Sequence, residues 1–390
     1  MDFSKKIGIL IFASIFLFAV WPVGGYVLAF LGLIWVVQRG EGKKIVDCFQ
    51  RDISIWLVFL AFWLSMIFAI GQKISLVATL VFTLQVGLYL LVRVYLRKER
   101  CFQTINLLLA TGLIVALVGI YQYFFSSIPT PAAWLDGDVY SDVHTRVFST
   151  LYNPNVLGSY LVLIIALTLG SLATVKGEKR LFLYVVLMAA YLCLLFTFSR
   201  GAWMAMLISV SALFFFYPKK RIILLILLII FLVSLPEYKN IVTRMNLELL
   251  NEDTSSVYRW QIWQGALKII QNNWLFGVGL GNFSFALAHY LPVKSFEVLH
   301  AHNTYLQILA ETGVVGFLAA GIFYGSTFFK AYHIHASSAN QEISNLALGI
   351  LVALFGLLVH GMVDATLFAP QLTVFFWILA ALVRNLGEMW

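Results

Sequence analysis

The polar segment from His300 to Gln307 (His-Ala-His-Asn-Thr-Tyr-Leu-Gln) holds the side chains best suited to moving a proton. It lies where the longest polar stretch of an apolar sequence runs into an apolar helix. A histidine with an ordinary pKa of about 6.5 is largely neutral at pH 7, so it can act as a base or donate a hydrogen bond. The alternative is an interfacial histidine that only satisfies its own hydrogen bonds.

His300 and His302 could together bind a metal ion, but their spacing argues against this. A membrane span is expected to begin near residue 302, and helical residues two apart point about 200° away from each other. A helical pair of metal ligands needs a spacing of three or four residues. We therefore expect no metal at this pair and no cofactor. Asp136 and Asp138 could hold Mg²⁺ beside a diphosphate, although two acidic residues in a polar loop are ordinary.

Three arginines and one aspartate are further candidates. Arg200, within Phe198-Ser199-Arg200-Gly201-Ala202, stands at a very short turn between two apolar runs. An arginine at such a boundary either faces a partner inside the helix bundle or extends to the membrane surface. The same two alternatives apply to Arg146 and Arg259. Asp364 marks the turn between the last two expected spans, where a carboxylate could orient a histidine or pair with an arginine.

The elements that must position these residues are membrane helices. The 390 residues are 61% hydrophobic and 11% charged, whereas soluble domains are about 45–50% apolar. Apolar runs of roughly 18 residues recur, as a membrane-spanning helix requires. The net charge of +8 is dispersed in short clusters at helix ends, so topology explains it better than a nucleic-acid partner. We expect a single all-α transmembrane domain over residues 1–390.

About twelve spans are expected, each bounded by polar residues. They cover residues 7–21, 24–38, 54–71, 74–92, 105–125, 154–175, 181–198, 201–217, 222–236, 302–325, 345–362 and 366–384. An even number places both termini on one side of the membrane. With the amino terminus in the cytoplasm, most Lys and Arg residues fall on the inner side, as the positive-inside rule requires. The histidine segment then faces the exterior.

The range 237–301 is expected to form one large extracytoplasmic loop, and long loops in compact proteins often carry function. Within it, Thr254-Ser255-Ser256 could cap a helix over about 257–272. An apolar stripe on this helix predicts that it lies along the membrane interface, and its members are Trp260, Trp263, Leu267 and Ile270. The glycine-rich segment 277–281 is expected to be a flexible turn, because the lysine of a phosphate loop is missing.

The motifs resemble those of a known family. His302-Asn303, followed after nine residues by Gly313 and then by Gly316, resembles the His-[Asn/Ser/Gln]-x9-Gly-x-x-[Gly/Thr/Tyr] signature of bacterial O-antigen ligases and the related O-antigen polymerases. The segment 198–202 resembles the Ser-Arg-Gly segment of this family. Tyr258-Arg259-Trp260 before Gly277-Val278-Gly279 resembles its outer-loop helix and turn. The specific motifs lie within about residues 195–320.

The resemblance implies about twelve helices and a metal-independent transfer of a glycan from undecaprenyl diphosphate to an acceptor hydroxyl, on the outer face of the bacterial plasma membrane. Arg200 and Arg259 match the family's two arginines, and His302 matches its catalytic histidine. These residue types suit the chemistry, because arginine binds phosphate oxygens bidentately. A base placed opposite the leaving group predicts inversion at the anomeric carbon.

Asn303, Arg146, His300 and Asp364 are expected to support the site or to bind the acceptor. The acceptor is lipid A-core or another envelope molecule for a ligase, and a growing glycan for a repeat-unit polymerase. A different class, a transporter of polysaccharide or lipid-linked oligosaccharide, suits twelve spans equally well. Transporters usually carry half-repeats and polar groups at mid-membrane, whereas the polar residues of this chain gather at the outer face and no repeat is visible in the sequence.

Overall fold

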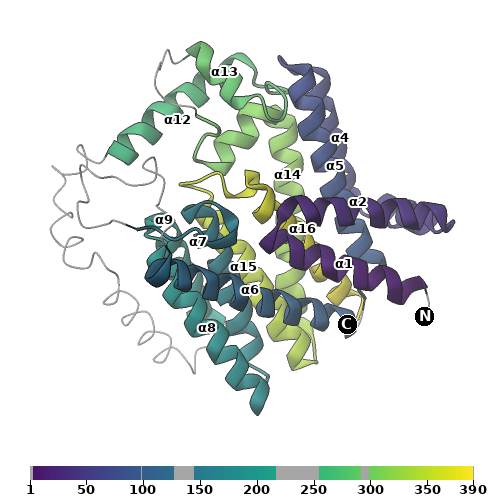
Figure 1. Cartoon of the computed structure of the whole chain (residues 1–390). Helices are drawn as coiled ribbons and strands as arrows, with labels where there is room; N and C mark the ends of the chain where they lie inside the picture. Colours follow the sequence, from purple (N-terminus) through teal and green to yellow (C-terminus); the bar gives the residue numbers. More distant parts are fainter. Residues whose placement is uncertain (1–2, 98, 127–144, 217–253, 291–297, 390) are drawn as a thin grey trace.

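Helices are the only regular elements in the part of the chain that the structure describes. The computed structural model describes residues 3–97, 99–126, 145–216, 254–290 and 298–389, and no strand occurs among them. Figure 1 shows the helices gathered into one bundle, with α12 and α13 at one end of it. The predicted all-α fold is confirmed.

The expected span 222–236 lies outside the described residues. Each of the other expected spans coincides with a helix. The helices are α1 (Phe3–Val20), α2 (Pro22–Gln38), α4 (Ile53–Ile67), α5 (Gln72–Tyr95), α6 (Glu99–Phe125), α7 (Pro154–Leu172), α8 (Glu178–Phe196), α9 (Arg200–Phe216), α14 (Thr304–Ser337), α15 (Gln341–His360) and α16 (Pro370–Gly387). Within the described ranges, 8 helices are long and apolar enough to cross a membrane, or 9 if one bent pair forms a single span. The chain is therefore a multi-pass membrane protein, while the total of twelve spans stays a prediction.

The bent pair consists of α2 and α3 (Gly42–Arg51), which meet at an angle of 109°. α3 is not among the elements predicted from the sequence. This helix is polar and none of its residues is buried, so no apolar run marks it in the sequence.

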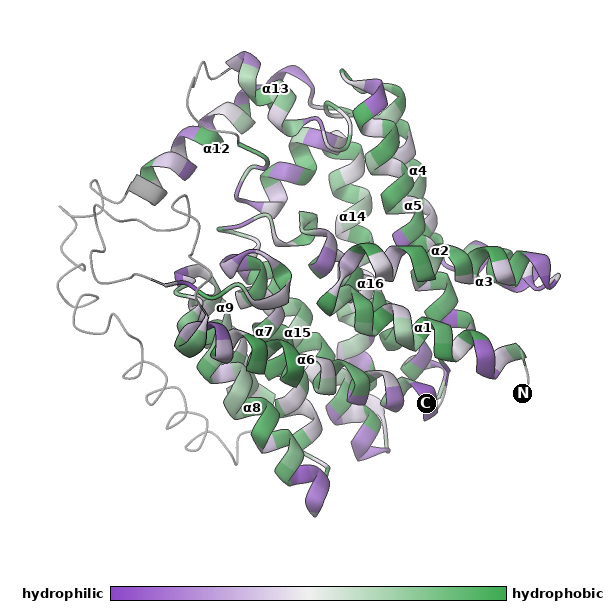
Figure 2. Cartoon of the chain, in the orientation of Figure 1, coloured by the Kyte–Doolittle hydropathy of each residue, from purple (hydrophilic) through white to green (hydrophobic). Residues whose placement is uncertain are grey.

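The most buried of the membrane-crossing helices are α15, α16 and α7, whose windows are 83%, 78% and 72% buried. Gly170 of α7 faces Gly349 of α15 so closely that an added Cβ at Gly170 would lie 2.6 Å from the Gly349 Cα. Small residues at such a contact let two helix backbones approach each other. Figure 2 shows hydrophilic residues gathered at helix ends and in α3 and α12, as expected for helices whose middle parts face lipid or the core.

Both ends of the chain are held at the turn between α5 and α6. Arg100 donates hydrogen bonds to the carbonyl oxygens of Ser4 and Tyr95, each at 2.8 Å. Near the carboxyl terminus, Asn385 donates to the carbonyl of Leu96 at 2.9 Å. The two termini therefore lie at the same end of the bundle, and the assignment of that end to the cytoplasm stays a prediction.

α14 is broken at Gly313, which has φ 63° and ψ −171°. The break frees backbone groups that a continuous helix would pair internally, and the glycine-rich segment after α12 satisfies them. Val278 donates its N–H to the Ala310 carbonyl at 2.9 Å. Gly279 donates its N–H to the Glu311 carbonyl at 2.8 Å. The glycine-rich segment is thus hydrogen-bonded into α14.

This arrangement gives the glycine-rich segment a different role from that of the flexible turn that the sequence predicts. On the carboxyl-terminal side of the break, Val314 donates its N–H to the Trp274 carbonyl at 2.8 Å. A Cβ at Gly277 would lie 2.4 Å from the backbone of Glu311, so only glycine allows the two segments to approach. A Cβ at Gly316 would meet the side chain of Thr312 in the same helix.

The helix predicted in the large loop is present as α12 (Thr254–Asn272), and a second one, α13 (Phe283–Tyr290), follows it. The predicted apolar stripe is wrong in part. Trp260 and Leu267 are 59% and 49% exposed. The buried face of α12 instead consists of small and branched residues, namely Ile262, Gly265, Ala266 and Ile269. The exposed Trp260 and Leu267 still suit a helix at the membrane interface.

Gly313→Ala is expected to lower the thermal unfolding midpoint of the detergent-purified protein. The added Cβ would lie 2.3 Å from the Leu275 carbonyl oxygen, and backbone strain of this kind costs about 1–3 kcal/mol. Gly321→Ala is the matched control, because Gly321 lies on the same helix with no atom within 4 Å of an added Cβ. Equal midpoints for the two variants would contradict the role of the break.

Candidate active site

Asn303 determines where α14 begins. Its backbone is extended, with φ −160°, and its side-chain oxygen accepts the N–H groups of Tyr305 at 2.9 Å and Leu306 at 3.0 Å. This is the usual arrangement of an N-cap. Its side-chain nitrogen donates to the Met362 carbonyl at 2.9 Å, in the turn between α15 and α16. Asn303 therefore fixes the start of α14 to that turn.

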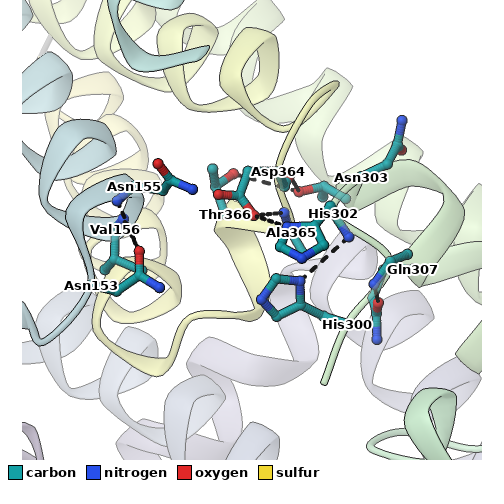
Figure 3. A network of polar contacts seen from close by, with 12 residues as sticks. Asn153, Asn155, Val156, His300, His302, Asn303, Gln307, Asp364, Ala365 and Thr366 are labelled. Carbon is teal, nitrogen blue, oxygen red and sulfur yellow. Dashed lines mark hydrogen bonds and ion pairs between the residues drawn. The ribbon is translucent and has the colours of Figure 1, made fainter. Parts of the chain in front are cut away.

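His302 comes directly before this cap and faces Asp364 (Figure 3). Its φ is 46°, a region that costs a residue with a side chain about 1–2 kcal/mol. The ring Nδ1 lies 3.3 Å from the Asp364 Oδ1. The same Oδ1 accepts the N–H of Ala365 at 2.8 Å. The Asp364 Oδ1 thus contacts both the imidazole of His302 and the backbone of its own turn.

The carboxyl of Asp364 is ionised in this setting. Burial alone would raise its pKa, but the surrounding histidines, above all His302, hold the pKa below its usual range. An ionised carboxylate only accepts hydrogen bonds. The proton of a neutral His302 therefore belongs on Nδ1, and Nε2 keeps the lone pair that a base needs.

His300 lies against His302, with the two ring centroids 4.2 Å apart. Burial and the neighbouring His302 lower the pKa of His300 to about 4, although the charge of Asp364 acts in the opposite direction. The ring is therefore neutral at pH 7. Its Nδ1 accepts the backbone N–H of His302 at 3.4 Å, which leaves the proton on Nε2. His300 also lines a large cavity, described below.

The argument from helical spacing against a metal ion at His300 and His302 does not apply. Both residues precede α14, which begins at Thr304, so the angle between helical residues does not separate their rings. One ligand atom from each of His300, His302 and Asp364 lies within 4.8 Å of the others. Among the described residues this is a group that a metal ion could join. Metal independence at this group stays a prediction.

Gly201, directly after Arg200, brings the start of α9 against the end of α15. A Cβ at Gly201 would lie 2.8 Å from the His360 Nε2. The other ring nitrogen of His360 is 2.5 Å from the Ser159 Oγ on α7. Arg200 is therefore placed beside the turn that carries Asp364. Ser159 and His360 are not among the residues predicted from the sequence, although each is a polar residue within an apolar helix.

Arg146 ties the turn before α9 to the start of α7. Its Nε donates to the Thr197 carbonyl at 3.0 Å, and one terminal nitrogen donates to the Asn155 side-chain oxygen at 3.1 Å. These contacts join the segment before Arg200 to the start of α7, and the supporting role of Arg146 stays a prediction.

Arg259 belongs to α12, which packs onto the histidine segment. Trp263 of this helix donates its ring N–H to the Ala301 carbonyl at 3.0 Å. The ring of Tyr258 lies edge-to-face with that of His302, at 6.3 Å between centroids. The positive charge of Arg259 is the smallest of the causes that act on the lowered pKa of His300.

Three helices begin in the same strained way at this site. Among the described residues, positive φ outside glycine occurs only at Ser149, Tyr152, Phe198 and His302. The last three lie two residues before the first residues of α7, α9 and α14.

The contacts of Gly201 and Thr304 place the starts of α9 and α14 at the turn 360–366. Asn153 and Asn155, at the start of α7, line the same cavity as Asp364. The first N–H groups of α7 and α14 are already paired, mainly with the side chains of Asn153 and Asn303. What these helix starts offer an anion is therefore the partial positive charge of the helix dipole.

A cavity of about 590 Å³ adjoins this turn. Its polar end includes His300, Gln307, Glu311 and Asp364, together with Asn153 and Asn155 from the start of α7. Its remaining walls are largely apolar and come from α4, α5 and α16, with Phe62, Phe82 and Trp377 among them. A ligand with a polar head and an apolar chain matches this division.

The fold and the site define a class of protein: a multi-pass membrane protein in which two histidines and an aspartate meet at the ends of membrane helices. Residues 183–321 match the family described as O-antigen ligase, and this range contains Arg200, Arg259 and His302. The chain is also similar to the teichuronic acid biosynthesis protein TuaE of Bacillus subtilis (strain 168), with 26% identity over 129 residues. That stretch covers 33% of this chain and 26% of the relative.

These two matches confirm the resemblance to the O-antigen ligase and polymerase family that the sequence motifs predict. Members of this family are membrane glycosyltransferase-like ligases and polymerases, which supports an enzymatic role for the chain. The aligned stretch spans about a quarter of the relative's length, so donor, acceptor and mechanism are matters for proposal.

His300→Gln is expected to make the protein less sensitive to acid. Between pH 6.5 and 4 the unfolded chain protonates His300 while the folded chain, with a pKa of about 4, does not. Folding stability therefore declines as pH falls through this window, by up to about 3 kcal/mol from this residue. Thermal unfolding of wild type and variant across the window measures the difference. His333→Gln, at the far end of α14, is the control, and parallel curves for wild type and His300→Gln would refute the burial argument.

Proposed function

We propose that the protein is a membrane glycosyltransferase that moves a glycan from undecaprenyl diphosphate to an acceptor hydroxyl on the extracytoplasmic face. The observation that carries this proposal is the His302–Asp364 pair, with 3.3 Å between Nδ1 and Oδ1, set among the starts of α7, α9 and α14. It combines an oriented base with surroundings that favour an anion. The family match over residues 183–321 supports the same reaction class.

His302 acts as the general base in this reaction. The acceptor oxygen forms a bond to the anomeric carbon while its proton passes to His302 Nε2. The bond between that carbon and the phosphate oxygen breaks, and undecaprenyl diphosphate leaves. Attack opposite the leaving group inverts the anomeric centre. Asp364 stabilises the imidazolium that forms, as a carboxylate does for a catalytic histidine in hydrolases.

The diphosphate binds at the positive side of the site. Arg200 and Arg259 supply guanidinium groups, which hold phosphate oxygens in a bidentate way without a metal. Fixed donors placed where negative charge develops are often the largest contribution to catalysis. Arg146 and Asn303 support this region by holding the starts of α9 and α14.

The cavity beside Asp364 supports a lipid-linked donor. Its polar end lies at His300 and Asp364, and its apolar walls come from helices that pass through the bundle. A polyprenyl chain fits the apolar part, while the first sugar fits the polar end, where the side chains of Glu311 and Asp364 can accept hydrogen bonds from its hydroxyl groups. His300 also lines this space and can donate a hydrogen bond to a sugar oxygen.

The acceptor separates two candidate functions with the same chemistry. A ligase places a finished glycan on lipid A-core or another envelope acceptor. A polymerase uses a second repeat unit as the acceptor, and the similarity to a teichuronic acid biosynthesis protein favours this candidate as the alternative. In either case the protein resides in the bacterial plasma membrane with both termini cytoplasmic and needs no cofactor.

His302→Ala is expected to reduce glycan transfer by about 10²–10⁴-fold, the usual contribution of a general base, without changing the unfolding midpoint. Purified protein is incubated with an undecaprenyl-diphosphate-linked oligosaccharide and candidate acceptors, and the glycosylated product is followed by mass spectrometry. His333→Ala is the control. Wild-type turnover in His302→Ala would remove His302 from the mechanism, and lipid movement across the bilayer without product from any acceptor would favour a transporter.

EDTA is expected to leave the rate of transfer unchanged, because the arginines and helix N-termini supply the positive charge. The test is informative because His300, His302 and Asp364 could join a metal ion. Loss of activity that Zn²⁺ restores would assign a metal to this group. Loss that Mg²⁺ restores would direct attention to Asp136 and Asp138, which lie outside the described residues.

A further inference from the structure

The start of α9 differs from the other helix starts at this site, because its first N–H groups are not paired. At α7 and α14, the side chains of Asn153 and Asn303 accept these groups. Ser199 holds the corresponding position before α9, but among the described residues neither its hydroxyl nor any carbonyl accepts the N–H of Gly201 or Ala202. Two donors therefore stay open at the first turn of α9.

Free N–H groups at a helix start are common, but the neighbour of this one is not. His360, the last residue of α15, is only 1% exposed. Its Nε2 lies 2.8 Å from the position that a Cβ at Gly201 would take. Because Cα–Cβ bonds tilt toward the N-terminus of a helix, this ring edge lies on the side of the free N–H groups. The Nε2 has no hydrogen-bond partner within the described ranges, and a buried polar atom without one is costly.

Ser159 determines which nitrogen of the His360 ring carries the proton. The Ser159 Oγ lies 2.5 Å from the His360 Nδ1. A serine within a helix often donates to the carbonyl four residues back, as Ser171 does to Leu167 at 2.9 Å. Ser159 has no such bond in the described part of the chain, so its hydroxyl proton is directed to Nδ1. A neutral ring then carries its own proton on Nε2, on the side of Gly201.

The groups that meet at this helix start favour an anion. Arg200 is the first residue of α9, and the helix dipole adds partial positive charge. Gly201 is only partly buried, so a ligand can reach its backbone. The carboxylate of Asp364, which would repel an anion, is directed to His302 and to the N–H of Ala365. Phosphate oxygens accept several hydrogen bonds at once and bind at such helix starts.

We propose that the start of α9 and the ring of His360 form a binding site for the phosphate oxygens of an isoprenyl diphosphate. The N–H groups of Gly201 and Ala202 and the Nε2–H of His360 donate to these oxygens. The turn that follows His360 lines the largely apolar cavity from Asp364 onward, which has room for the isoprenyl chain. His360 thus adds a fixed neutral donor to the charge of Arg200 where the leaving group gains negative charge.

This site deepens the proposed function, because the identity of the diphosphate as the glycan donor rests on that function. The presence of an anion site at the start of α9 does not rest on it. A test of diphosphate binding alone therefore separates the two proposals.

The test uses the full-length protein in phosphatidylcholine nanodiscs. His360→Phe keeps a ring and removes the donor, whereas His360→Gln keeps an N–H donor. His335→Phe is the matched control, because His335 also pairs its Nδ1 with a serine, the Ser344 Oγ at 3.1 Å, near the start of α15. Equilibrium binding of radiolabelled farnesyl diphosphate, a short isoprenyl diphosphate, gives the Kd, and thermal unfolding checks folding.

His360→Phe is expected to raise the Kd by about 10–100-fold, the range for one lost hydrogen bond to a charged group. His360→Gln and His335→Phe are expected to bind nearly as tightly as wild type. Equal Kd values for wild type and His360→Phe, or a His360→Gln variant as weak as His360→Phe, would overturn the proposal. Loss of binding in nanodiscs that contain phosphatidylglycerol would assign the site to a lipid headgroup instead.

Hydrogen exchange in the wild-type protein tests the same site without a substitution, and it decides the matter if His360→Phe does not fold. Farnesyl diphosphate is expected to slow the amide exchange of residues 200–203, whereas farnesol, which has the chain without the charge, is not. Unchanged exchange at saturating farnesyl diphosphate would overturn the proposal even if the protein transfers glycans. Protection of this segment in a protein that transfers no glycan would count only against the proposed function.

Discussion

The break in α14 at Gly313 is the constraint on which the rest of the structure depends. Within a membrane, every buried backbone group needs a partner inside the protein, so a helix can open only where another segment supplies N–H and C=O groups. The segment 274–279 does this on both sides of the break. The two parts of the family motif, far apart in sequence, are therefore joined by main-chain hydrogen bonds. The short part of α14 before the break carries Gln307 and Glu311, and Asn303 is its N-cap.

The residues of the candidate site lie at or next to the ends of helices. α7, α9 and α14 each begin two residues after a residue with positive φ, and the starts of α9 and α14 lie at one turn of the chain. That turn contributes Asp364, whose carboxylate lies 3.3 Å from His302. Charged and titratable groups are thus collected where the helices end and the apolar middle of the bundle is left intact. The same arrangement explains why a glycine follows Arg200, because His360 occupies the space of a side chain at that position.

Features that depend on local sequence were predictable. Hydropathy gives the spans because each helix must be apolar along its own length, and the motifs around Arg200 and His302 carry the family resemblance. Features that depend on contacts between distant segments were not predictable from the sequence. The closeness of His300 and His302 follows from a strained backbone before the cap, and the Ser159–His360 contact joins residues 201 positions apart. Trp260 was assigned to a stripe by its hydrophobicity, although the small residue Ala266 fits the buried face of α12 better.

The turn that carries Met362 and Asp364 lies close to the carboxyl end of the chain, yet it anchors Asn303 and orients His302. During synthesis, the arginine and histidine segments enter the membrane before this turn exists. An incompletely inserted chain therefore has neither the anchor of α14 nor the carboxylate that orients the imidazole. The arrangement of Asn303 and His302 is therefore complete only when the turn between α15 and α16 is in place.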